Sequence, residues 1–130
     1  MTNTNEEQIR ALIDKWALAV RNEDISAILA HHTDDIVMFD VPLPLQSKGI
    51  DEYKKTWDLY FSWSRDSIFD ILEMKIIANE NIGFAFGIMR CTGTSKEGVK
   101  DDLTFRLTIC LIKKENEWFI CHEHHSLPAE

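Results

Sequence analysis

Hydrophobic residues near the start of the chain recur at helical spacing and fall on one face. Thr4 precedes this stretch and Glu7 follows three residues later, which is the arrangement of a capping box. The polar segment NED ends the predicted helix, and its Asp24 is suited to cap a short second one. After Gly49 a second apolar stripe predicts a third amphipathic helix. The two stripes comprise Ile9, Leu12, Ile13, Trp16 and Val20, and then Ile50, Tyr53, Trp57, Tyr60 and Phe61.

The second half of the chain changes to long apolar strands separated by short polar turns, a pattern typical of antiparallel hairpins. Helices followed by a meander indicate an α+β fold in a single domain, residues 1–130. Because long sheets twist and curl, we expect a strongly curved antiparallel sheet wrapped around the N-terminal helices, with an internal pocket. The expected strands are 36–41, 67–78, 82–94, 101–113 and 117–127.

Composition and charge exclude several classes of partner. The net charge of −8 and the lack of a basic cluster argue against binding nucleic acid or an anionic membrane surface. No apolar run approaches the length of a membrane span. The polar N-terminus does not resemble a signal peptide, and three cysteines without a secretion signal predict reduced thiols in the cytoplasm. No glycine-rich or P-loop fingerprint predicts a cofactor.

Several local strings resemble the NTF2-like superfamily, specifically its SnoaL-like, ketosteroid isomerase-like branch. These strings are DDIVMFDVP followed by GIDEY, then IMRCTGT, FRLT and the terminal W-x-x-x-HEHHS-x-P. The resemblance covers almost the whole chain and implies the cone-shaped, cystatin-like fold. The association domain of calmodulin-dependent kinase II carries a similar tryptophan, alternating histidines and a serine. The fold hosts enzymes, transport factors and assembly modules, so the resemblance implies no single reaction.

The resemblance to ketosteroid isomerase is tested at three positions. That enzyme has its catalytic aspartate five residues after an Asp-Asp pair, and here Asp40 follows Asp35 at that spacing. Trp16 stands where the isomerase has its tyrosine donor, and Phe105 stands near the position of its acidic donor. An enolate needs donors aimed at its oxygen, so the resemblance supports a base without the familiar donors.

Asp40 and the terminal histidines are the predicted catalytic residues. Asp40 lies between apolar neighbours, where desolvation would raise its pKa and suit a general base; a strand-end aspartate bonded to the adjacent loop is the alternative. Strand alternation from Trp118 places His122 and His124 inward, lining the pocket, and His125 outward. The two inward histidines are expected to act as hydrogen-bond or acid–base groups rather than as metal ligands, since nothing else shows ligand spacing. Satisfied core histidines or a subunit contact remain the alternative.

Two arginines inside apolar strands, Arg90 and Arg106, predict either an anion clamp for a ligand or structural ion pairs. A tight turn before the last strand would separate Arg106 from His122 and His124, whereas a bulge would place them on one face. Trp57 and Tyr60 are further candidates for the pocket wall.

The sequence thus predicts a pocket domain that binds a small molecule of unknown identity. It would act as an isomerase, dehydratase or cyclase that needs no cofactor, with an Asp or His base. The alternative is a non-catalytic ligand-binding or association module. Apolar residues on both faces of every meander strand predict a homodimer through the outer face of the sheet.

Overall fold

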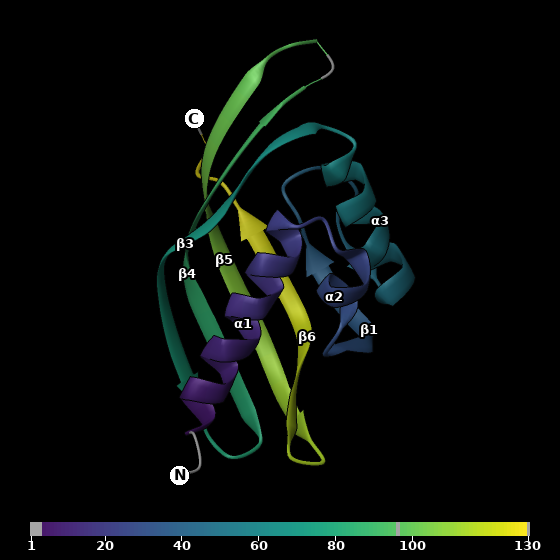
Figure 1. Cartoon of the computed structure of the whole chain (residues 1–130). Helices are drawn as coiled ribbons and strands as arrows, with labels where there is room; N and C mark the ends of the chain where they lie inside the picture. The colour runs from purple at the N-terminus through teal and green to yellow at the C-terminus, as the bar shows by residue number, and fades with distance from the viewer. Residues whose placement is uncertain (1–3, 96, 130) are drawn as a thin grey trace.

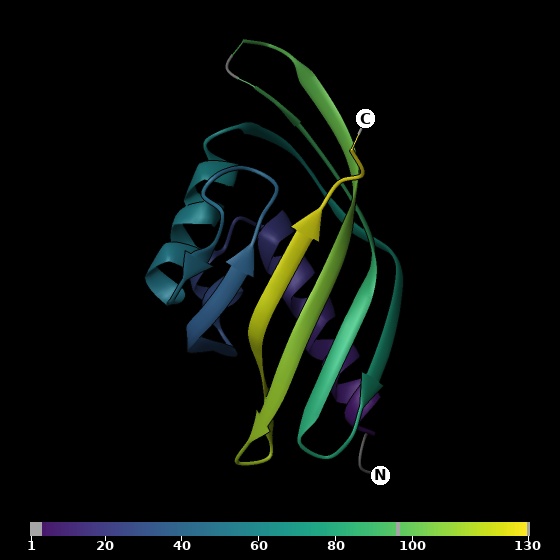
Figure 2. The same ribbon diagram turned by 180° about the vertical axis from the view of Figure 1, so that it is seen from behind.

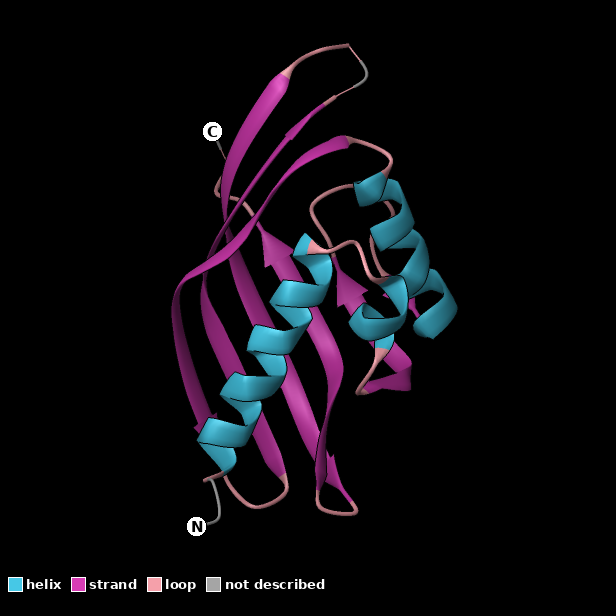
Figure 3. Ribbon diagram, in the orientation of Figure 1, coloured by secondary structure: helices cyan, strands magenta, loops and turns pink. Residues whose placement is uncertain are grey.

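The computed structural model describes residues 4–95 and 97–129, in which helices lie against one face of a curved sheet (Figures 1 and 3). The long first helix crosses the concave face, and the third helix lies beside β1 at the edge of the sheet, where it contacts β1 and β2 (Figure 1). No helix in this part of the chain is long and apolar enough to span a membrane. The helices are α1 (Asn5–Arg21), α2 (Ile25–Leu29) and α3 (Ile50–Phe61).

The strands form one six-stranded sheet in the order β2-β1-β6-β5-β4-β3. The expected α+β cone is confirmed, with one difference. The first strand pairs in parallel with the last, so the sheet is mixed rather than purely antiparallel. This pairing joins the last strand of the meander to the chain's first strand, and it brings residues 85 to 88 positions apart side by side. The strands are β1 (His32–Phe39), β2 (Ser47–Lys48), β3 (Ser64–Ala78), β4 (Ile82–Thr94), β5 (Lys100–Lys114) and β6 (Glu117–Ser126).

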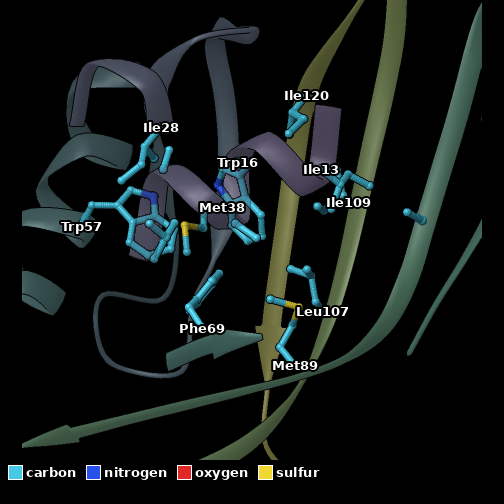
Figure 4. Packing of buried hydrophobic residues seen from close by; sticks show 14 of the residues in the cluster. Ile13, Trp16, Ile28, Met38, Trp57, Phe69, Met89, Leu107, Ile109 and Ile120 are labelled. Carbon is cyan, nitrogen blue, oxygen red and sulfur yellow. The ribbon is translucent and has the colours of Figure 1, made fainter. Parts of the chain in front are cut away.

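The apolar stripes of the predicted helices contribute to the hydrophobic core. Thr4 and Glu7 make the predicted capping box, with Thr4 Oγ1 accepting from the Glu7 N–H at 3.1 Å and Glu7 Oε1 accepting from the Thr4 N–H at 3.2 Å. Side chains from α1 and α3 meet the inward residues of the strands in one apolar cluster (Figure 4). Its labelled members include Ile13, Trp16, Trp57, Phe69, Met89, Leu107, Ile109 and Ile120.

Two of the register shifts in the sheet, one in β3 and one in β6, affect which side chains face inward. In β3 the register shifts between Ile71, which pairs with Met89, and Glu73, which pairs with Ile88. A Cβ added to the neighbouring Gly87 would clash with the Glu73 carbonyl oxygen. In β6 the partner of Leu111 is Ile120 but the partner of Cys110 is His122, so Cys121 is the extra residue. A bulge leaves one residue unpaired and reverses the alternation beyond it. The convex face of the sheet carries no helix (Figure 2).

Candidate functional site

A cavity of about 290 Å³ lies between α3, the end of β1 and the inner faces of β3 to β6. Its walls are mainly apolar and aromatic, and Trp57 and Tyr60 of α3 line it, as expected. Mostly apolar walls with few polar groups are typical of a small-molecule site. Its ionisable lining residues, among those described, are Asp40, Tyr60, Cys91, Asp101 and His125.

The structure reverses the predicted orientation of the terminal histidines. Ahead of the bulge, Trp118 and Ile120 point inward as expected. The extra residue Cys121 then shifts the alternation, so that Glu123 and His125 are buried and His125 lines the cavity. The prediction that His122 and His124 line the pocket and His125 does not was wrong, because it assumed an unbroken alternation.

His122 and His124 lie on the outer side of the sheet beside Phe39. Nδ1 of His122 donates to the Val37 carbonyl oxygen at 2.6 Å. The Phe39 ring centroid is 4.8 Å from that of His122 and 5.4 Å from that of His124, and His124 is exposed. Neither lines the cavity, and among the described residues no group of three His, Cys, Asp or Glu could hold a metal ion.

Both arginine candidates also lie away from the cavity. Arg90 makes a two-point ion pair with Asp102, with both N–O distances 3.0 Å, so the structural alternative is observed with a partner that was not predicted. Arg106 donates to Ser126 Oγ at 3.0 Å and shares the outer face with His124. The turn before β6 is the tight two-residue form. Arg106 nevertheless shares a face with His124, because the extra residue lies within β6 and not in the turn. An anion clamp made of Arg90 and Arg106 is therefore wrong.

Glu123 is fully buried beneath the cavity and is held by three side chains. Its Oε2 lies 2.9 Å from His32 Nε2 and accepts from the Tyr53 hydroxyl at 2.5 Å. Its Oε1 lies 3.2 Å from Nε2 of His125. The Tyr53 oxygen in turn accepts from the Trp16 indole N–H at 3.3 Å. This buried network joins α1, β1, α3 and β6, and the sequence reading did not find it.

The charges of this network follow from its contacts. Burial alone would raise the pKa of Glu123, but hydrogen bonds from His125 and His32, together with the charge of those rings, lower it to about 2. Burial raises the pKa of Tyr53 well above its ordinary value, and the nearby Glu123 raises it further. Glu123 is therefore a carboxylate near neutral pH, and Tyr53 remains a protonated donor.

Asp40 lies where β1 ends and lines the cavity, with 23% of its side chain exposed. Its Oδ1 accepts from the Val41 N–H at 2.8 Å and lies 3.7 Å from Nδ1 of His125. Asp40 therefore both lines the cavity and makes the hydrogen bond to the adjacent loop that was the structural alternative. The His125 ring stands between two carboxylates, with Glu123 behind it and Asp40 at the cavity wall.

The positions compared with ketosteroid isomerase carry no acidic or phenolic donor here. The indole N–H of Trp16 donates to the Tyr53 hydroxyl oxygen, and Phe105 contributes an apolar ring to the cavity wall. The polar end of the described cavity is thus centred on Asp40 and His125, which is suited to accept a proton or a hydrogen bond.

A curved sheet around a long helix, with a side pocket of this kind, defines the NTF2-like class of proteins. The sequence profile of the SnoaL-like domain matches residues 9–130, and the chain belongs to this family. A comparison with curated proteins finds no match.

Solved structures agree with this assignment. An NTF2-like protein of unknown function from Pseudomonas putida KT2440 is 30% identical, with 100% of this chain and 91% of that chain covered and a TM-score of 0.87. A ketosteroid isomerase-like protein from Erwinia carotovora atroseptica is 20% identical, with 99% and 100% covered and a TM-score of 0.78. A proposed dehydratase of the NTF2-like family from Streptomyces avermitilis is 10% identical, with 95% and 97% covered and a TM-score of 0.80. The latter two show the shared fold.

Proposed function

We propose that this SnoaL-like domain binds a small, mainly apolar molecule and moves a proton within it, as an isomerase or dehydratase that uses no cofactor. The observation that carries the proposal is the His125 ring, which lies at the wall of an apolar cavity between the carboxylates of Glu123 and Asp40. A ring flanked in this way can take up a proton and be stabilised while it holds one.

The proton transfer has two balanced steps. Nδ1 of His125 forms a bond to a proton as the ligand's C–H or O–H bond breaks, and the electron pair stays on the ligand. The imidazolium then returns the proton at a second position, which gives an isomer, or to a departing hydroxyl, which releases water. The carboxylates of Asp40 and Glu123 stabilise the imidazolium between these steps. The names of two solved relatives, one ketosteroid isomerase-like and one proposed as a dehydratase, support this class of chemistry.

Hydrogen exchange in heavy water tests the proposal without knowledge of the substrate. Cyclohexanone and indanone are neutral cyclic ketones with acidic C–H groups, and proton NMR follows the loss of those signals. We expect exchange above the buffer rate, and His125→Asn should slow it by about 10²–10⁴-fold. His124→Asn changes the same residue type on the outer face and should leave the rate unchanged. Absence of protein-dependent exchange, or exchange that survives His125→Asn, would contradict the proposal.

We also propose that the domain forms a homodimer through the convex face of the sheet. Five large apolar side chains on β3 and β4 are at least 40% exposed, and the rings of Phe84 and Phe86 are stacked with an interplanar angle of 17°. Adjacent strands place these residues side by side, because Ile77 pairs with Phe84. Soluble monomers seldom expose such a patch, and two-fold pairing of sheets would cover it. The exposed residues are Leu72, Ile77, Ile82, Phe84 and Phe86.

A further inference from the structure

Glu123 is unusual because a carboxylate with no exposure is rare unless its charge is compensated. A purely structural role would explain its contacts with His32 and Tyr53, which hold α3 and β1 together. It does not explain the third contact, in which Oε1 meets Nε2 of His125, a residue of the cavity wall. The positions of the protons around the carboxylate determine how this third contact affects the His125 ring.

The protons of the network can be assigned from which atoms are able to donate. Nδ1 of His32 lies 2.9 Å from the Ala30 carbonyl oxygen, which only accepts, so Nδ1 carries a proton. Tyr53 donates its hydroxyl proton to Oε2 of Glu123, and Nε2 of His32 lies 2.9 Å from the same oxygen and 3.0 Å from the Tyr53 oxygen. Because a carboxylate only accepts, the contact between His32 and Oε2 is a hydrogen bond when Nε2 of His32 carries a proton as well. Oε2 is therefore occupied by these two partners, and Oε1 is left to His125.

The contact between Glu123 and His125 consequently fixes the tautomer of the histidine ring. An ionised carboxylate has no proton to give, so the hydrogen at this 3.2 Å contact belongs to Nε2 of His125. In the neutral ring the other nitrogen, Nδ1, is then an acceptor. Nδ1 is on the side of Asp40, whose carboxylate is also an acceptor.

We infer that Glu123 is a positioning residue that holds His125 with Nδ1 as an acceptor, so the pocket takes an apolar ligand that presents a hydroxyl or N–H group to Asp40 and His125. This inference rests on the proposed function, since it specifies how the proposed base is oriented and what it meets. It assigns a ligand with a hydrogen-bond donor, in contrast to the anionic ligand expected when Arg90 and Arg106 were placed at the pocket. The same tautomer leaves Nδ1 free to take up the proton that the reaction moves.

The direct test is ring-nitrogen NMR of the wild-type protein with labelled histidine. We expect the neutral His125 ring to carry its proton on Nε2, with Nδ1 giving the signal of an unprotonated nitrogen. A neutral ring protonated on Nδ1 would overturn the inference, even if the protein exchanged ketone protons. Conversely, a ring protonated on Nε2 in a protein without proton-exchange activity would uphold the tautomer and contradict the proposed function.

Glu123→Gln changes the tautomer with little change in shape. The amide oxygen would accept from Tyr53, and the amide N–H₂ would face Nε2 of His125, which must then become the acceptor. Nδ1 would turn into a donor toward the pocket. We therefore expect the Nδ1 signal of His125 to become that of a protonated nitrogen and the Nε2 signal to become that of an unprotonated one. The rate of ketone hydrogen exchange should fall by about 10²–10⁴-fold, because the base is held in the wrong tautomer.

Two probes of similar size, benzyl alcohol and benzoate, measure the polarity of the pocket by NMR titration. The alcohol offers a donor, whereas benzoate offers only acceptors. Asp40 repels benzoate in either protein, so the change in the ratio of the two dissociation constants is the informative quantity. Glu123→Gln should move that ratio toward benzoate by about tenfold, the value of one good hydrogen bond. A Glu123 with only a structural role would weaken both probes together and leave the ratio unchanged.

Tyr53→Phe is the matched control, because it removes one donor to Glu123 and keeps the carboxylate beside His125. We expect this variant to retain the wild-type tautomer and the wild-type probe ratio. A reversed tautomer in Tyr53→Phe would overturn the assignment of the role to Glu123. If Glu123→Gln does not fold, the wild-type NMR spectrum and the Tyr53→Phe variant still decide the inference.

Discussion

The two faces of β6 carry the same residue types in different surroundings. His125 is buried at the inner face against the fully buried Glu123, whereas His122 and His124 stand on the outer face beside Phe39. The inner histidine is fixed by a carboxylate and meets a cavity. The outer His122 donates to a backbone carbonyl and His124 is exposed. The comparison teaches that one extra residue in a strand, and not the motif HEHH itself, decides which histidine is available for chemistry.

The largest expected effect is a loss of stability, and it should be much larger when a buried carboxylate is removed than when an exposed one is removed. Glu123→Ala leaves His32, Tyr53 and His125 without their common partner, so we expect a loss of about 3–5 kcal/mol in the free energy of unfolding. Asp102→Ala removes the exposed outer partner of Arg90 and should cost much less, because solvent screens a surface ion pair. Urea denaturation of both variants measures the difference. Equal losses would contradict the distinction between the two faces.

The stability of the protein should depend on pH through the Glu123 carboxylate. The pKa of Glu123 is about 2 when folded against an ordinary value of 4.5, so the folded state binds its proton less readily than the unfolded state. Its contribution, about 3 kcal/mol, is present above pH 4.5 and is lost as the pH falls toward 2. Urea midpoints between pH 6 and pH 2 should drop less steeply in Glu123→Gln than in the wild type. Parallel curves for the two proteins would count against an ionised Glu123.

Asp40 should affect chemistry more than stability. Its carboxylate lies 3.7 Å from Nδ1 of His125, and in the proposed mechanism it stabilises the protonated ring. We expect Asp40→Asn to slow ketone exchange by about 10²-fold, at the low end of the range for a residue involved in proton transfer. Asp14→Asn makes the same charge change on the exposed side of α1 and serves as the control. An unchanged rate in Asp40→Asn would remove Asp40 from the mechanism.

The smallest expected effect concerns the outer face. Replacing Phe84 and Phe86 by serine should shift a dimer to a monomer, because it removes the largest exposed apolar side chains of β4. Light scattering at micromolar concentration measures the change in mass, and ketone exchange in the same variant should persist. A wild-type mass of 15.1 kDa would show that the convex face does not form the proposed dimer.

Much of the fold could be predicted because it depends on local patterns. The capping box at Thr4 and the strand over 82–94 occur as expected, since side-chain periodicity and turn residues specify them. The parallel pairing of β1 with β6 did not follow, because no local signal links segments so far apart in the sequence.

The candidate site was predicted less well for a physical reason. Asp40, Trp57 and Tyr60 were placed correctly at the pocket, whereas the histidines were exchanged by the bulge at Cys121. A bulge depends on the curvature of the whole sheet and leaves little trace in a single strand. In the Glu123 network, His32 and Glu123 contact each other directly although they are 91 positions apart in the sequence. The one sequence signal for the network was a glutamate inside a strand with buried neighbours.

The most direct test of the central claim is an NMR titration of histidine-labelled protein with benzyl alcohol. If the inner face of β6 carries the site, the ring signals of His125 will shift in proportion to ligand bound, and those of His122 and His124 will stay in place. Shifts at His122 and His124 with an unchanged His125 would contradict the account, because they would place the ligand on the convex face of the sheet.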